Sequence, residues 1–246
     1  MLTATALKTI AIVAMLIDHV AYVFLPETSV LCIIMRLIGR VTAPIMFYFV
    51  AEGYRKTRHF GRYATRLGIF AAISYIPFVY CHSGALPNAQ NWAELNVIYT
   101  LFLGLLALRA RHEIKSPLIR WAVIGGLILL SVPGDWSYYG ILFILVFDHY
   151  YGDFRQQAFA YCLITLLMLS PLFTVLASSL IFHLYPFNVE YYLPGLAQLG
   201  MFIPIFLLKF YGGQKGGGGQ LAKWGFYVFY PAHLLVLALI RDFLPL

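Results

Sequence analysis

The sequence predicts an all-α fold: a polytopic bundle of about nine transmembrane helices, forming one integral membrane domain over residues 1–246. The first observation is composition, because 61% of the residues are hydrophobic and only 11% are charged, whereas soluble domains carry about 25% charged residues. The second is a series of apolar runs, each long enough to cross about 30 Å of hydrocarbon. The third is an alternation of basic and non-basic connections between these runs.

The predicted spans are separated by polar, glycine or proline residues. They cover residues 5–25, 30–53, 62–81, 95–110, 117–133, 137–150, 157–182, 191–210 and 222–243.

The first four spans follow from apolar length and from the breaks between them. The run 5–25 has the length of a signal peptide, but it contains Asp18 and is followed by further spans, so we interpret it as a retained helix. In the run 30–53, Pro44 cannot donate to the carbonyl of Arg40, and this predicts a bend just after Arg40. Basic segments then separate 30–53 from 62–81, and 95–110 from 117–133.

The later spans are less regular. The run 137–150 is short, which is typical of a shallow or broken helix. The glycine-rich segment "GGQKGGGG", residues 212–219, precedes the last run and lacks the spacing of a P-loop. Two interpretations of this segment stay open: a flexible linker, or a phosphate cradle made by backbone N–H groups and Lys215.

Basic residues predict the orientation, because cytoplasmic loops are enriched in Lys and Arg. With the N-terminus in the cytoplasm and the C-terminus outside, 14 of the 17 basic residues fall on the cytoplasmic side. They are Lys8, Arg55, Lys56, Arg58, Arg62, Arg66, Arg109, Arg111, Lys115, Arg120, Arg155, Lys209, Lys215 and Lys223. The loops assigned outside, "PETS", "HSGALPNAQNWAE", "VPGDWSYY" and "HLYPFNVEYY", contain none. The net charge of +7 therefore reflects membrane topology, and we expect no nucleic-acid partner.

Several ionisable residues fall inside the first two spans. Lys8 and His19 are eleven residues apart, three helical turns, so they share a face at a separation of about 16 Å. Arg36 and Arg40 are four apart on the returning helix and can meet Asp18. A buried ion pair with a packing histidine is one interpretation, and a polar functional site is the other.

Two further groups of residues are candidates. The segment "YRKTRHFGRYATR" carries Arg55, Lys56, Arg58, Arg62 and Arg66. Topology alone explains this charge, and recognition of a phosphorylated cytosolic ligand is the alternative. In the last span, Tyr230 and His233 share a face with Phe226, which puts a second imidazole at membrane depth. Lesser candidates are Asn96, Thr100, Asp135, Trp136, Asp148, His149 and Gln198. The three cysteines show no CxxC spacing, so we predict no metal site.

The segments "LKTIAIVAMLIDHV", "RLIGRVTAPIMFYFVAEGYRKTRHFGRYATRLGIF" and "FYVFYPAH" together resemble the TraX family of membrane proteins. That family is named for the conjugative pilus protein that acetylates the N-terminus of pilin, and the resemblance runs from Lys8 to His233. The family is in turn similar to membrane acyltransferases that take acetyl groups from cytosolic acetyl-CoA. In that wider group, a basic residue, ten residues and then a histidine on the first helix recur at the active site. Here the pattern falls on Lys8 and His19.

The resemblance implies an acyltransferase-like domain in the bacterial cytoplasmic (inner) membrane, with acetyl-CoA as the donor. The acceptor would be an amine or hydroxyl: an N-terminus like that of pilin, a glycan or a lipid headgroup. His19 is expected to act as general base or to accept the acetyl group transiently. Asp18 would orient or charge-balance the imidazole, and Arg36 or Arg40 would stabilise the thioester oxyanion or a neighbouring carboxylate. Coenzyme A would be held by Lys8, Arg55, Lys56, Arg58, Arg62, Arg66, Tyr230 and His233.

Two other function classes stay open. A proton-coupled transporter or flippase is one, because intramembrane Asp, His and Arg also suit a proton relay. Against it, the hydropathy pattern shows no internal repeat, whereas many transporters have one. A non-catalytic assembly protein for surface structures is the other.

Overall fold

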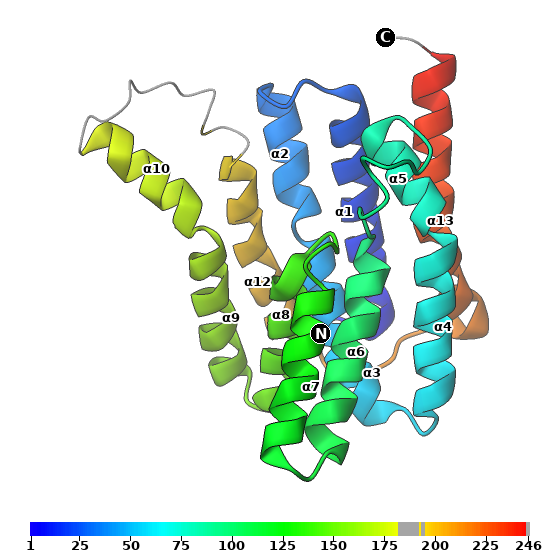
Figure 1. The fold of residues 1–246 in the computed structure, drawn as a ribbon, viewed down its shortest axis with the longest axis vertical. Helices are drawn as coiled ribbons and strands as arrows, with labels where there is room; N and C mark the ends of the chain where they lie inside the picture. Colours follow the sequence, from blue (N-terminus) through cyan, green and yellow to red (C-terminus); the bar gives the residue numbers. More distant parts are fainter. Residues whose placement is uncertain (182–191, 193–194, 245–246) are drawn as a thin grey trace.

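The fold is a helical bundle, seen in a computed structural model that describes residues 1–181, 192 and 195–244 (Figure 1). Its elements are α1 Ala4–Phe24, α2 Val30–Gly39, α3 Thr42–Lys56, α4 Phe60–Ile73, α5 Tyr75–Ser83, α6 Val97–Glu113, α7 Pro117–Leu130, α8 Ser137–His149, α9 Phe154–Met168, α10 Ser170–Leu180, the 3-10 helix η1 Ala197–Phe202, α12 Ile203–Lys209 and α13 Gly219–Phe243. Within the described ranges there is no strand, only two isolated bridges. The all-α prediction is confirmed.

Four segments are long and apolar enough to cross a membrane: Ala4–Phe24, Val30–Lys56, Phe60–Ser83 and Trp224–Phe243. The pair α9 and α10, bent by 51° at their junction, makes a fifth if it counts as one span. The helices at 117–130, 137–149 and 197–209 are apolar but shorter. The first residues of the predicted span 191–210 fall largely outside the described part of the chain. The count of nine spans and the direction of the termini stay predictions.

Three predicted spans are broken, each just before a proline. The span 30–53 divides into α2 and α3 at residues 40–41, as Pro44 predicts. The span 62–81 divides at Ser74, ahead of Pro77, and the span 157–182 divides at Leu169, ahead of Pro171. A proline has no N–H to donate to the carbonyl in the preceding turn, so the helix bends there.

Short polar side chains start several of the helices. Thr3 accepts a hydrogen bond from the backbone N–H of Ala6, and Asp153 accepts one from Gln156. Asn96 accepts from two N–H groups at the start of α6, while its own amide donates to the carbonyl of Ala71 at 2.8 Å. A side chain that caps one helix and bonds a second one also sets how α6 lies against α4.

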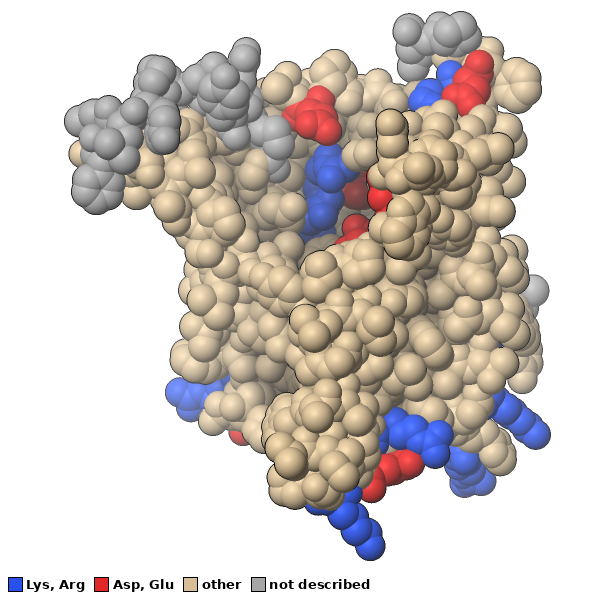
Figure 2. All heavy atoms as spheres, viewed as in Figure 1, with Lys and Arg blue, Asp and Glu red and all other residues tan. Residues whose placement is uncertain are grey.

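Lys and Arg gather at one end of the bundle. Figure 2 shows most of their atoms at the lower end, where Figure 1 places the α3–α4, α6–α7 and α8–α9 turns. A second blue and red cluster lies inside a hollow nearer the opposite end. The basic connections assigned to the cytoplasm therefore share one end of the molecule.

A buried carboxylate ties three helices together at this basic end. Asp148 of α8 is fully buried and accepts from Arg55 Nε of α3 and from His112 Nε2 of α6, both at 2.8 Å. Arg111 Nη1 lies 3.7 Å from the same carboxylate, and Arg55 also donates to the Asp148 carbonyl. Asp148 thus supplies the negative charge that lets α3 and α6 carry arginines into the packed end of the bundle.

Replacing Asp148 should destabilise the protein. We expect Asp148→Ala to cost on the order of 3 kcal/mol, because it leaves two cations without their buried partner. Thermal unfolding of the detergent-purified protein measures the effect. The matched control is Glu113→Ala, whose exposed pair with Arg109 contributes about 0.3–0.5 kcal/mol. Equal unfolding midpoints for the two variants would contradict this role.

Candidate active site

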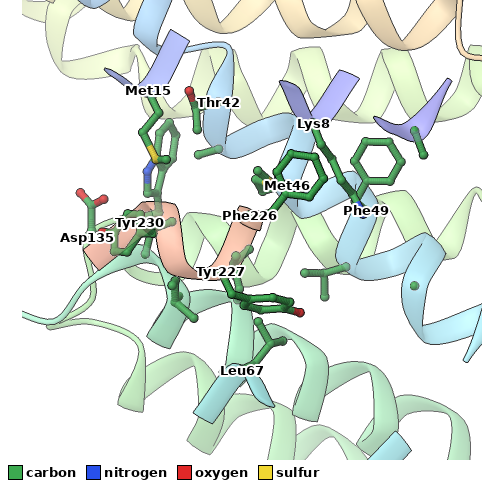
Figure 3. Close-up of a pocket in the computed structure, with 18 of the residues that line it drawn as sticks. Lys8, Met15, Thr42, Met46, Phe49, Leu67, Asp135, Phe226, Tyr227 and Tyr230 are labelled. Atoms are coloured by element: carbon green, nitrogen blue, oxygen red, sulfur yellow. The ribbon is translucent and has the colours of Figure 1, made fainter. Parts of the chain in front are cut away.

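One cavity of about 640 Å³ passes through the middle of the bundle. Lys8, Arg66 and Lys215 line it near the start of α1, and Asp18, Arg36, Arg40 and Asp135 line it further along. Figure 3 shows Lys8 beside Phe49 and Phe226 at one end, and Asp135 beside Tyr230 at the other. Lys8 and His19 both line the cavity, so the prediction that they share a face of the first helix is confirmed.

His19 lines this cavity, and Nδ1 of its ring has two hydrogen-bond contacts. Its Nδ1–H donates to the carbonyl of Met15 at 2.8 Å and lies 3.3 Å from Nε2 of His233. His233 in turn donates from Nδ1 to the carbonyl of Phe229 at 2.8 Å. Because a carbonyl can only accept, each ring carries its proton on Nδ1. Neutral His19 therefore keeps a free lone pair on Nε2, as a general base or nucleophile requires.

A third imidazole belongs to this cluster and escaped the sequence analysis. The ring centroid of His82 lies 5.7 Å from that of His19, and its Nδ1 bonds the carbonyl of Phe78. The sequence assigned His82 to an outer loop because the apolar run ends at residue 81, but α5 continues to Ser83. The sequence would have placed His82 beside His19 only if the predicted helix had been extended by one residue, from 81 to 82. Among the described residues no group of His, Cys, Asp and Glu has the geometry of a metal site.

Asp18 pairs with the two arginines of the returning segment. Arg40 Nη2 lies 3.2 Å from Oδ1, and Arg36 Nη1 lies 4.0 Å from Oδ2. The prediction that Asp18 meets Arg36 and Arg40 is confirmed. The groups within hydrogen-bond distance of the His19 ring are the Met15 carbonyl and His233, and a charge-balancing part for Asp18 stays a prediction. The carboxylate neutralises charge that would be costly at membrane depth.

The approach of α2 to α1 at this pair depends on a glycine. A Cβ atom added to Gly39 would lie 2.2 Å from Cβ of Asp18. A hydrogen bond from Thr42 Oγ1 to the carbonyl of Ala11, 2.8 Å long, also holds the following helix against α1. Arg40 keeps one polar atom, Nε, enclosed and without a hydrogen-bond partner among the described residues.

The residues predicted to bind coenzyme A fall into two groups, those that line the cavity and those that do not. Arg66 joins Lys8 in the cavity lining, and Tyr230 lines it too, while His233 lies behind His19. Arg55 is bonded to Asp148 and Lys56 to Glu52 at 2.8 Å, and these two do not line the cavity. Arg58 and Arg62 lie outside the cavity lining as well. A part in ligand binding stays a prediction for all of them.

The lesser candidates also have places. Asp135 and Trp136 line the cavity, where Trp136 lies 5.9 Å from the guanidinium of Arg40. Asn96 is a helix cap and Asp148 an ion-pair centre. Thr100 is buried, with its hydroxyl unbonded among the described residues, in the space that Gly134 and Gly140 leave open.

Gly39→Ala should push α1 and α2 apart and separate Asp18 from the arginines. Overpacking of this kind costs about 1–3 kcal/mol, so we expect a lower thermal midpoint in detergent. Gly125→Ala is the matched control, because nothing lies within 4 Å of an added Cβ there. A Gly39→Ala protein as stable as Gly125→Ala would mean that the close approach is not required.

Comparison with known proteins identifies the family of the chain. The model of the TraX protein family matches residues 3–241. The chain is 35% identical over 251 aligned residues to the probable fimbrial assembly protein FimC, serogroup H1, of Dichelobacter nodosus, covering 98% of this chain and 97% of that relative. No solved structure matches significantly. Several apolar helices and this match together identify a membrane protein related to pilus proteins, and the chain belongs to the TraX family.

Proposed function

We propose that the protein is an integral membrane acetyltransferase. It moves an acetyl group from cytosolic acetyl-CoA to an amine or hydroxyl acceptor at the membrane or cell envelope. The observation that carries this proposal is the single cavity that joins a cationic end at Lys8 to the free Nε2 of His19. Acetyl-CoA is strongly anionic at its nucleotide end and neutral at its thioester end. The residues along the cavity have the matching order of charge.

The proposed orientation places the Lys8 end toward the cytoplasm. In the proposed topology, the chain crosses the bacterial inner membrane nine times, with its N-terminus in the cytoplasm and its C-terminus outside. The gathering of Lys and Arg at one end of the bundle supports this direction (Figure 2). The donor would enter from the basic end, and the acceptor would reach His19 from the end lined by Arg36 and Asp135.

The cavity residues have complementary parts in the proposed reaction. His19 Nε2 takes the proton from the acceptor amine or hydroxyl while the acceptor attacks the thioester carbonyl. The guanidinium of Arg40, which lines the cavity, stabilises the negative charge on the carbonyl oxygen. As the carbon–sulfur bond breaks, protonated His19 returns the proton to the departing sulfur. The Met15 carbonyl holds the imidazole in the required tautomer, and His233 contacts the same Nδ1.

The acceptor proposed first is a pilin-like protein of the envelope. The support is the family itself and the fimbrial assembly protein to which the chain is similar. A glycan or a lipid headgroup would undergo the same chemistry at a hydroxyl.

His19→Ala should abolish acetyl transfer, because it removes the imidazole that takes the proton from the acceptor. Purified protein and radiolabelled acetyl-CoA, with an envelope fraction from a strain lacking the gene as acceptor, give the rate. Mass spectrometry of that fraction identifies the species that gains one acetyl group. The control is His59→Ala, since His59 is exposed and does not line the cavity.

Transfer at the normal rate by His19→Ala would overturn the catalytic part of the proposal. No transfer by the wild type, together with pH-driven uptake of a solute into vesicles, would replace it with a proton-coupled carrier. A cavity lined by ionisable groups along its length is the feature that such a carrier would share.

A further inference from the structure

The glycine-rich segment 212–219 is fixed against the start of the chain. The backbone N–H of Gly212 donates to Leu2 at 2.9 Å, and those of Ala4 and Thr5 donate to Gln214 and Lys215. The Thr5 hydroxyl adds bonds to the carbonyls of Lys215 and Gly217, both 2.9 Å long. A flexible linker does not form five such bonds, so the linker interpretation of the sequence does not hold.

The close fit of this segment requires glycine. Gly216 has φ +80°, and a Cβ atom there would lie 2.5 Å from the Thr3 hydroxyl. Gly217 and Gly219 line the cavity together with Lys215. The glycines therefore let the backbone lie flat between the start of α1 and the mouth of the cavity.

The two sides of this backbone are used differently. Carbonyl groups of residues 213–215 and 217 accept hydrogen bonds from the start of α1 and from Lys56. In contrast, no N–H group of residues 213–218 donates to another residue that the structure describes. Residues 213–218 thus have backbone N–H groups without a partner among the described residues, and two of them, Lys215 and Gly217, line the cavity. Unpaired backbone N–H groups can bind anions.

Three cations converge on the same end without a matching anion. Lys8, Arg66 and Lys215 line the cavity and lie within electrostatic range of one another. None has an ion-pair partner in the described part of the chain. Glu52, a carboxylate whose charge acts on Lys8, is already bonded to Lys56 and to the hydroxyl of Tyr211. The Nε of Arg66 is enclosed and also unbonded to any of these residues.

We propose that Lys8, Arg66, Lys215 and the glycine-rich segment form a binding site for a phosphate group. Arginine and lysine with free backbone N–H groups are the usual donors to phosphate. An anion here would offset the mutual repulsion of three partly enclosed cations. The assignment of the ligand to the phosphates of the acyl donor rests on the proposed function. A phospholipid headgroup would supply the same chemistry.

Direct binding to the detergent-purified full chain tests the site. The probes are coenzyme A, its adenosine bisphosphate moiety and phosphate-free pantetheine. We expect the first two to bind and pantetheine to bind at least about tenfold more weakly. Lys215→Gln and Arg66→Gln should each weaken binding of the bisphosphate about tenfold, and Lys215→Arg should restore it. Lys209→Gln and Arg155→Gln are matched controls, because both residues are exposed and neither lines the cavity.

The source of the phosphate is decided in bilayers of phosphatidylcholine with and without phosphatidylglycerol. Competition of phosphatidylglycerol with the bisphosphate, or stabilisation by this lipid that Lys215→Gln abolishes, would identify a headgroup site. Bisphosphate binding that is indifferent to the lipid would identify the nucleotide.

The site and the proposed reaction fail in different ways. Coenzyme A that binds with the expected dependence on Lys215 and Arg66, without any acetyl transfer, would overturn the reaction and leave the phosphate site standing. Acetyl transfer that depends on His19, with bisphosphate binding unchanged in both glutamine variants, would overturn the phosphate site alone. Equal thermal midpoints of wild type and variants, measured first, ensure that weaker binding is not unfolding.

Discussion

The structure depends on how it neutralises charge inside an apolar bundle. Two arginines and an aspartate at membrane depth would each cost several kcal/mol if left alone. They are brought together because Gly39 lets α2 approach α1 at Asp18. The ion pair keeps the arginines at the cavity wall, and the break after Arg40 turns the chain into α3, whose Thr42 bonds α1 again. One close contact thereby sets the geometry of three elements around the cavity.

The last helix, α13, contributes two residues to the site around His19. His233 meets His19 across 214 positions of sequence, and Tyr230 lines the cavity beside it. Each of the two rings bonds the carbonyl four residues earlier in its own helix, which settles both tautomers without any charged partner. The helix geometry therefore fixes a neutral imidazole with one unbonded nitrogen. Asp18 balances the charge of the arginines.

The two ends of the cavity differ in net charge. The cations near the glycine-rich segment have no carboxylate of their own, whereas Arg36 and Arg40 share Asp18. The first end thus attracts an anion, and the second is close to neutral. Arg55 and Lys56 belong to neither end, because Asp148 and Glu52 bind them. Position relative to the cavity, and not the number of basic residues in a segment, separates these roles.

The sequence by itself determined the all-α membrane class, the shared face of Lys8 and His19 and the bend after Arg40, because hydropathy, helical periodicity and proline act locally. Only the tertiary structure decided that His82 joins the histidine cluster, that His233 contacts His19 and that residues 212–219 bind the start of α1. Those outcomes depend on distances between residues far apart in the chain. A repeating pattern within one helix carries no information about which helix lies beside it.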